Sequence, residues 1–184
     1  MPSATYRRIR LVFISMISML VLPIAAGKLS AQTAIDPEEL YGIDYERLEK
    51  IVAVPQLIAR ADGLYQFMKE RPDSKLTDYA QGVFFQTLDT LLKQGNDTAV
   101  LGLSERMLQL RPRLGEAYCF YGIALKNRKR YPEAMDALAK SYVLKNNKLA
   151  AKAKEVLDLV YKGVNKGSLV GQDELIKKAQ QEIK

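Results

Sequence analysis

Few residue types in this sequence could carry out chemistry. The 184-residue chain contains no histidine and a single cysteine, Cys119, which excludes Ser–His–Asp and Cys–His sites. A zinc site would have to combine that thiol with carboxylates. Two acidic pairs, Glu38–Glu39 and Asp173–Glu174, stand where helices are expected to begin, and interaction with the helix dipole explains both. We therefore expect no enzyme, no cofactor and no metal site.

The sequence also contains a cluster of positive charges at Lys126, Arg128, Lys129 and Arg130, between two stretches that are mostly apolar or small. Such a cluster could bind a polyanion. It could also form the solvated corner between two helices, where cations complement the negative end of the first helix. We favour the corner, with polyanion binding through the basic C-terminal half as an alternative function.

The N-terminal residues have the order of a secretory signal peptide. The positively charged start "MPSATYRRIR" precedes an uncharged apolar run, Leu11–Ala26, and then small residues. This order predicts a signal over residues 1–31, cleaved after Gly27 or Ala31, and a periplasmic or secreted bacterial protein. The 16-residue apolar run contains Pro23 and is shorter than the roughly 20 residues that span a bilayer. An uncleaved anchor in the inner membrane is the alternative.

Charge is distributed unevenly along the rest of the chain. Removing residues 1–31 takes away four basic and no acidic residues, so the net charge falls from +7 to +3. Residues 36–105 carry 13 acidic and 7 basic side chains, whereas residues 106–184 carry 8 acidic and 17 basic ones. A chain with two such ends could orient against a charged partner or stack head to tail.

Helical periodicity runs through the sequence from residue 37 onward. Asp36 before Pro37 is a strong helix start, and no stretch shows sustained alternation of period two. We predict an all-α chain of antiparallel helices with short turns. After a lead-in and helix over residues 32–54, helices are expected within the ranges 55–73, 75–96, 97–112, 115–130, 131–147, 148–163 and 173–184.

Residues 115–148 contain a helix pair with a recognisable pattern. Large residues alternate with small ones in "YxxYGxxL…RYPEAxxALxxSYxLxNN", which resembles the tetratricopeptide repeat (TPR). Asn146 stands where this family usually has proline, and Lys129 where it often has glycine. The residues expected to pack the two helices together are Tyr118, Tyr121, Gly122, Leu125, Tyr131, Ala134, Leu138 and Ser141.

The stretch directly before this pair, residues 81–114, forms a weaker copy of the pattern. Gly95 and "LQLRP" match the turns, but Leu88, Val100 and Met107 replace small residues. Residues 148–162 resemble the capping helix of such an array, and residues 173–183 form a last helix that folds back onto the repeat or docks another protein. The resemblance implies helix pairs stacked as a short right-handed superhelix with flanking helices.

TPR arrays bind peptides or partner proteins on a concave face lined by the first helix of each pair. The resemblance therefore implies an exported, non-enzymatic scaffold or adaptor for a protein or peptide. A small envelope enzyme subunit is the remaining alternative, and nucleic acid is not an expected partner. No membrane span is expected after cleavage, although the protein could associate peripherally with the envelope. The implied concave residues are Phe85, Asp89, Lys93, Glu116, Cys119, Ile123, Lys126 and Asn127.

Overall fold

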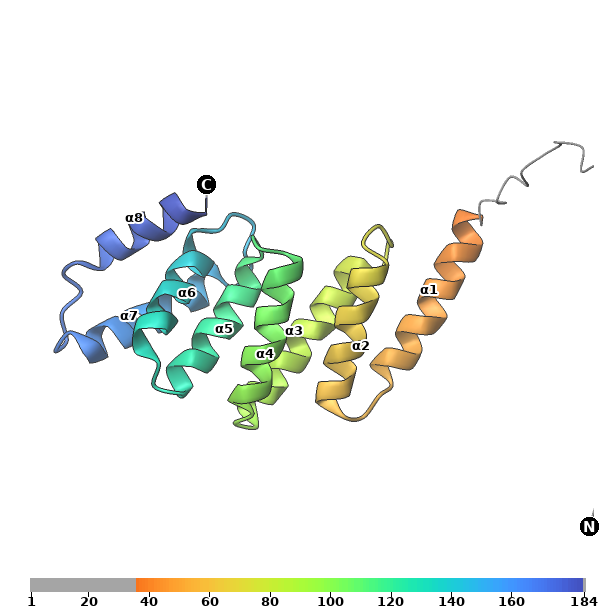
Figure 1. Ribbon diagram of the computed structural model, residues 1–184, viewed down its shortest axis with the longest axis horizontal. Coiled ribbons are helices and arrows are strands. Elements are labelled where there is room, and N and C mark those ends of the chain that lie inside the picture. The colour runs from red at the N-terminus through yellow and green to blue at the C-terminus, as the bar shows by residue number, and fades with distance from the viewer. Residues whose placement is uncertain (1–35, 184) are drawn as a thin grey trace, which may run out of the picture. The chain divides into compact units, whose positions relative to one another are not determined.

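The computed structural model describes residues 36–183, and this part of the chain is all-helical (Figure 1). The predicted all-α class is thereby confirmed, whereas the predicted signal peptide lies outside the described residues. One helix corresponds to each predicted range from residue 37 onward, to within one residue at the end of α7 and the start of α8. The helices are α1 (Pro37–Val52), α2 (Leu57–Glu70), α3 (Thr77–Lys93), α4 (Asp97–Leu110), α5 (Gly115–Asn127), α6 (Tyr131–Val143), α7 (Ala150–Val164) and α8 (Gln172–Glu182).

The helix ends have local causes in the sequence. At α1, the Asp36 carboxylate accepts the Glu38 N–H at 2.9 Å, and Pro37 needs no amide partner. Gly95 after α3 and Lys129 after α5 both have left-handed backbones, with φ of 73° and 62°. Their N–H groups donate to the carbonyls of Leu92 and Lys126, at 3.0 and 2.9 Å. The two turns thus share one geometry although only one contains glycine.

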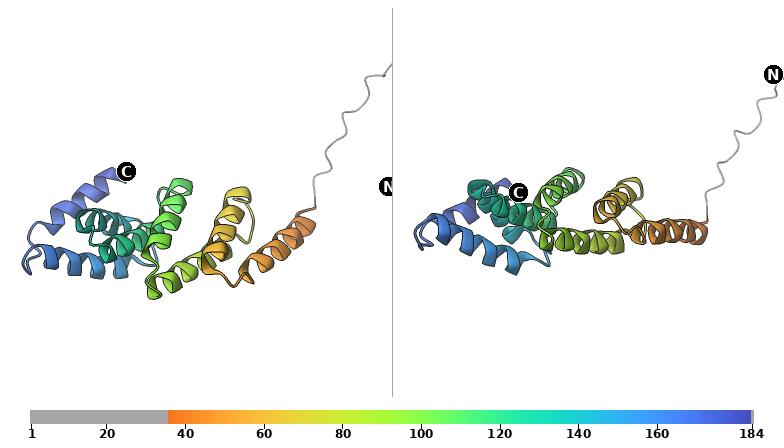
Figure 2. Two further views of the ribbon diagram at one scale, coloured as in Figure 1. Left: turned by 60° about the horizontal axis from the view of Figure 1, so that its bottom comes forward. Right: turned by 90° about the horizontal axis from the view of Figure 1, so that it is seen from below.

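Packing is local along the row of helices. Each helix from α1 to α6 contacts the next, α3 and α7 both also contact α5, and α8 folds back against α6. In the right-hand view of Figure 2, α1 and α3 lie along one side and α2 and α4 along the other. Lys140 on α6 pairs with Glu182 on the last helix and with Asp136 on its own helix, both at 2.8 Å.

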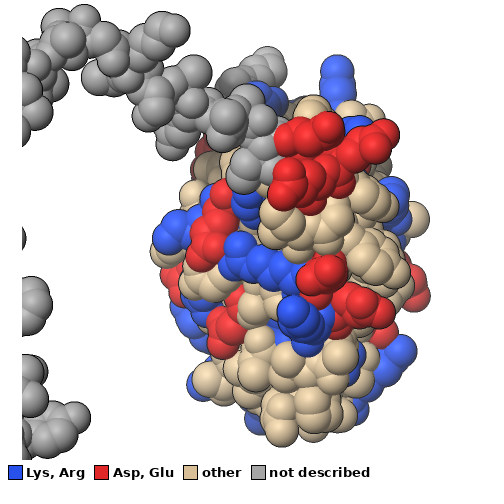
Figure 3. Space-filling model, turned by 90° about the vertical axis from the view of Figure 1, so that its right-hand side faces the viewer, with Lys and Arg blue, Asp and Glu red and all other residues tan. Residues whose placement is uncertain are grey.

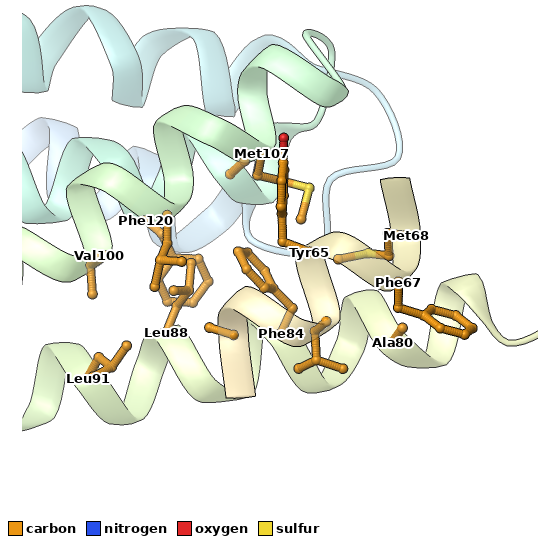
Figure 4. Packing of buried hydrophobic residues seen from close by; sticks show 14 of the residues in the cluster. Tyr65, Phe67, Met68, Ala80, Phe84, Leu88, Leu91, Val100, Met107 and Phe120 are labelled. Atoms are coloured by element: carbon orange, nitrogen blue, oxygen red, sulfur yellow. The ribbon is translucent and has the colours of Figure 1, made fainter. Parts of the chain in front are cut away.

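Two large hydrophobic cores and a small cluster between α5 and α6 hold the row together. The larger core joins Leu48 of α1 with α2, α3, α4 and the inner face of α5, where large side chains interdigitate (Figure 4). The smaller core lies under α7, which presses Ala153 and Leu157 against α5 and α6. The most deeply buried large side chains include Phe67, Phe84, Leu88, Met107, Leu125, Leu138 and Leu157.

The α5–α6 pair packs closely around one glycine. A Cβ atom at Gly122 would lie 2.7 Å from Leu138 Cγ and 3.3 Å from the Ala134 carbonyl oxygen. At the far end of the pair, the buried Ser141 hydroxyl donates to the Gly115 carbonyl at 2.8 Å. The small residues therefore lie where the helix backbones come nearest to each other.

The other predicted packing residues lie to one side of this contact. Leu125 and Ala134 are fully buried, and Tyr118 and Tyr121 are half-buried beside them. Tyr131, in contrast, is 38% exposed. It stands at the first position of α6, where one side of the ring faces solvent.

The α3–α4 pair is packed differently. Leu88, Val100 and Met107 occupy the register positions that Gly122, Ala134 and Ser141 occupy in the next pair, and all three are fully buried. Correspondingly, α3 and α4 approach each other less closely than α5 and α6 do. Within residues 36–183, no helix is long and apolar enough to cross a membrane.

Candidate functional site

A groove of about 960 Å³ opens along α3, α5 and the start of α7. Three of the residues predicted for a binding face, Phe85, Asp89 and Glu116, come together in it. Polar residues outnumber apolar ones in the lining, but more of the exposed groove surface is apolar, and two aromatic rings form its base. It consists of Asp78, Gln81, Gly82, Phe85, Gln86, Asp89, Thr90, Leu114, Glu116, Phe120, Asn146, Lys148, Leu149 and Lys152.

Two stacked aromatic rings form the base of this groove. Phe85 on α3 and Phe120 on α5 are nearly parallel, at an interplanar angle of 4° and with ring centroids 5.5 Å apart. Phe84 meets Phe85 edge-on, also at 5.5 Å. Phe120 is buried and Phe85 half-buried, so Phe85 offers an apolar surface that is held in place from below.

Paired charges form one wall of the groove. The Asp89 carboxylate lies 2.6 Å from Lys93 Nζ and 3.6 Å from Lys152 Nζ on α7. The hydrogen bond from Lys93 lowers the pKa of Asp89, with a further contribution from Lys152, against the opposing effect of burial. Lys152 lines the groove and keeps much of its side chain exposed, whereas Lys93, predicted for the binding face, pairs with Asp89 but does not line the groove.

The opposite wall is built by the turn between α6 and α7. Glu116 is buried near the start of α5, and its Oε1 accepts the Lys148 N–H at 3.2 Å. A Cβ atom at Gly115 would lie 2.6 Å from Asn147 Cγ, and Asn147 Nδ2 donates to the Ser141 carbonyl at 2.6 Å. These contacts hold Asn146 and Lys148 beside α5.

Asn146 gives a physical reason for one departure from the TPR pattern. Its φ is 61°, whereas the proline ring fixes φ near −65°. Proline could not adopt this turn, and asparagine is among the residues that tolerate the left-handed region best.

Two residues predicted for the binding face are instead part of the core. Cys119 is fully buried and Ile123 nearly so, because α7 covers this side of α5. Desolvation raises the pKa of the Cys119 thiol to about 11. In this arrangement neither side chain can contact a partner.

The last two predicted residues belong to the corner between α5 and α6. Asn127 Nδ2 donates to Asp97 Oδ1 at 2.7 Å, and the neighbouring Arg128 donates to Thr98 Oγ1 at 2.6 Å. Arg130 pairs with Glu133 at 2.9 Å. Two of the four basic residues of the cluster, Arg128 and Arg130, thus bond to the starts of α4 and α6, and neither Lys126 nor Asn127 lines the groove.

The sequence-based prediction missed the contribution of α7. Lys148, Leu149 and Lys152 line the groove, but residues 148–162 were interpreted only as a capping helix. The spacing of Lys148 and Lys152, one turn apart, could have indicated this face. Phe120 was likewise not predicted as a groove residue, because its neighbours Tyr118 and Tyr121 indicate a role in packing the helices together.

Comparison with known proteins adds no assignment. Neither a protein-family model, nor a curated protein, nor a solved structure matches this chain. Among the described residues, no group of three or more cysteine, aspartate or glutamate side chains could hold a metal ion.

Proposed function

We propose that this protein is an exported, non-enzymatic scaffold or adaptor of the TPR type, which binds a peptide or a segment of a partner protein in the α3–α5–α7 groove. The observation that carries the proposal is the groove itself. The groove lies along α3, α5 and the start of α7. These are every second helix of the row, as the first helices of stacked pairs would be.

The repeated turns support the TPR interpretation. Gly95 and Lys129 stand at equivalent positions of the two pairs with the same left-handed backbone. Asn96 and Arg130, which follow them, donate to Leu91 and Leu125 at 2.9 and 3.0 Å. A turn geometry that recurs after about 34 residues is expected of repeated helix pairs.

The chemistry of the groove favours an extended peptide over a small metabolite. The groove is open and long, its base is an aromatic surface, and its walls offer amides and both charge signs. An apolar peptide side chain would rest on Phe85. Asn146, Gln81 and Gln86 could bond the peptide backbone, and Lys152 or Asp89 could pair with charged peptide groups.

A peptide-display selection on the whole chain, followed by calorimetry, tests this proposal. We expect the selected peptides to lose at least about tenfold in affinity, or about 1.4 kcal/mol, when Gln86→Arg or Lys152→Glu alters the groove. Glu105→Lys and Lys69→Glu, at exposed positions outside the groove, serve as matched controls. Peptides that bind equally well to the groove variants, or a selection without binders, would refute the proposal.

A second candidate function rests on a separate cavity. Arg113, Lys145 and Lys177 line a cavity of about 750 Å³ together with Val143, Leu144, Gln180, Gln181 and Ile183, and no acidic residue lines it. Three cations without a counter-charge in the lining favour an anionic ligand. Binding of heparin that falls steeply with salt and is lost in Lys145→Glu/Lys177→Glu would support this function; binding that ignores salt would exclude it.

A further inference from the structure

Exposed hydrophobic residues gather at the two ends of the described row of helices. Of the eleven large hydrophobic residues that are exposed in residues 36–183, four lie on α1 and the start of α2, and four lie on the second half of α7 and the loop after it. The end helices of a repeat array normally present a polar outer face. The two groups are Tyr41, Ile43, Tyr45 and Ile58, and Leu159, Val164, Leu169 and Val170.

The charges around these two groups are opposite. Residues 36–46, which we name the acid end, contain no basic residue and expose Asp36, Glu38, Glu39 and Glu46. Residues 159–170, the basic end, contain no acidic residue and expose Lys162 and Lys166. In Figure 3, which faces the α1 side, the largest group of acidic side chains lies near the top beside uncharged surface, with basic and further acidic side chains below it.

The outer acids of α1 are distinct from the charges that hold this helix in place. Asp44, on the inner face, is buried and lies 3.2 Å from Arg71 Nε. Arg47, on the same helix, pairs with Glu70 of α2. The exposed acids make no ion pair with any described residue, and neither do Lys162 and Lys166, so these side chains are available to a second molecule.

The basic end is a fixed surface. The Tyr161 hydroxyl donates to the Val170 carbonyl at 3.0 Å, and the Gly167 N–H donates to the Lys162 carbonyl at 2.8 Å. Gly171, at φ 90°, leaves no room for a Cβ beside the Tyr161 hydroxyl, which would lie 2.9 Å away. These bonds hold the loop that carries Leu169 and Val170, which lowers the entropy lost when a partner binds.

We propose that the acid end of one copy of this chain binds the basic end of another, head to tail. Each end combines apolar side chains with one sign of charge, and the signs are complementary between the ends but not within either one. A contact between two different surfaces of the same chain repeats from copy to copy, so it builds either a closed ring or, where the rotation between copies does not close, an open row. The inference does not depend on the groove.

Analytical ultracentrifugation of the whole 184-residue chain, over a range of protein and salt concentrations, tests this proposal. We expect the average mass to rise with concentration to at least that of a dimer, and the association to weaken severalfold between about 0.05 and 0.5 M salt. Glu38→Lys/Glu46→Lys and Lys162→Glu/Lys166→Glu should each abolish it. An equimolar mixture of the two variants should restore it, because opposite charges again face each other.

Two controls make the outcome decisive. Glu105→Lys/Glu133→Lys and Lys69→Glu/Lys129→Glu reverse equally many charges at exposed positions away from both ends and should leave association intact. A wild-type chain that stays monomeric overturns the proposal. So does an effect of one end variant without the other, which indicates a symmetric contact, or association that persists in both, which indicates contact through other residues.

Discussion

The helix pairs α3–α4 and α5–α6 align in sequence, but the larger of two facing side chains lies on the first helix in α3–α4 and on the second helix in α5–α6. In α5–α6, Gly122 on the first helix meets Leu138 on the second, whereas at the equivalent positions of α3–α4 Leu88 stands on the first helix and Ser104 on the second. All four residues are buried. Large and small side chains can thus exchange places between the two helices of a pair. The helices of α5–α6, where the first helix carries glycine, lie closer together than those of α3–α4.

The two pairs also differ in the helices that they pack against. α5 and α6 pack mainly on each other, whereas α3 packs most extensively on α2, and α4 on α5. Leu88 belongs to a core that contains residues of five helices, whereas Gly122 allows one direct contact between two helices. We therefore expect a loss of side-chain volume to destabilise α3–α4 and a gain of side-chain volume to destabilise α5–α6.

The largest expected effect follows from removing volume in α3–α4. Leu88→Ala should lower the free energy of unfolding by about 2–5 kcal/mol, because it leaves a cavity in the larger core. Urea denaturation measures this change. Leu159→Ala, at a leucine that is 65% exposed, is the matched control and should stay within about 0.5 kcal/mol. Equal losses in both variants would contradict the core described for α3.

Adding volume to α5–α6 should have the next largest effect. Gly122→Ala introduces a Cβ that meets Leu138 at 2.7 Å, and such overpacking costs about 1–3 kcal/mol. Gly82→Ala on α3 is the matched control, since nothing lies within 4 Å of its Cβ. This control should stabilise the chain by about 0.5–1 kcal/mol, because alanine favours a helix over glycine. Thermal unfolding of both variants should give shifts of opposite sign.

Two buried serines distinguish the second helices of the pairs. Ser141 donates to the Gly115 carbonyl and accepts from Asn147 Nδ2 at 2.9 Å, so Ser141→Ala should cost about 1–3 kcal/mol by leaving those groups unpaired. The Ser104 hydroxyl has no hydrogen-bond partner among the described residues, and Ser104→Ala should be neutral or stabilising. A comparable loss in both variants, measured in urea, would show that the α4 hydroxyl is satisfied.

The smallest effect concerns Asp89, whose counterpart in the next pair is Ile123. The pKa of Asp89 is lowered in the folded chain from its ordinary value of 3.8. Its ion pairs therefore stabilise the fold above that pH, and the stabilisation is lost as pH falls through the lower folded pKa. At pH 7, Asp89→Asn should cost no more than about 1 kcal/mol, because the carboxylate is partly solvated.

Urea denaturation of wild type and Asp89→Asn at pH 7 and pH 2.5 checks this prediction. The difference between the two proteins should be present at the higher pH and shrink at the lower one. If the difference in the free energy of unfolding grew on acidification, the fold would favour the protonated form of Asp89 over the carboxylate, which contradicts the prediction.

The sequence was sufficient to predict the helices and most of their limits. Apolar spacing, the Asp36–Pro37 start and the breaks after Glu70, Leu110 and Asn127 are local signals, and the observed helices follow them. The close approach at Gly122 was also predicted, since only a small residue there allows the contact.

The sequence was not sufficient to predict the groove. Whether Cys119 and Ile123 are open or covered depends on where α7 lies, and that is decided by packing between segments distant in sequence. Likewise, the stacking of Phe85 on Phe120 joins residues of two helices that are not consecutive in the chain. Periodicity shows which side of a helix is apolar but not which neighbour, or solvent, that side will meet.

The exchange of bulk between the two pairs also limits how such a chain can change over generations. Converting the α5–α6 arrangement into that of α3–α4 requires a larger residue at 122 and a smaller one at 138. A larger residue at 122 alone would clash with Leu138, and a smaller residue at 138 alone would leave a void. The two positions should therefore change together or not at all, and a recombination that joins α5 of one lineage to α6 of another would separate partners that are viable only as a set.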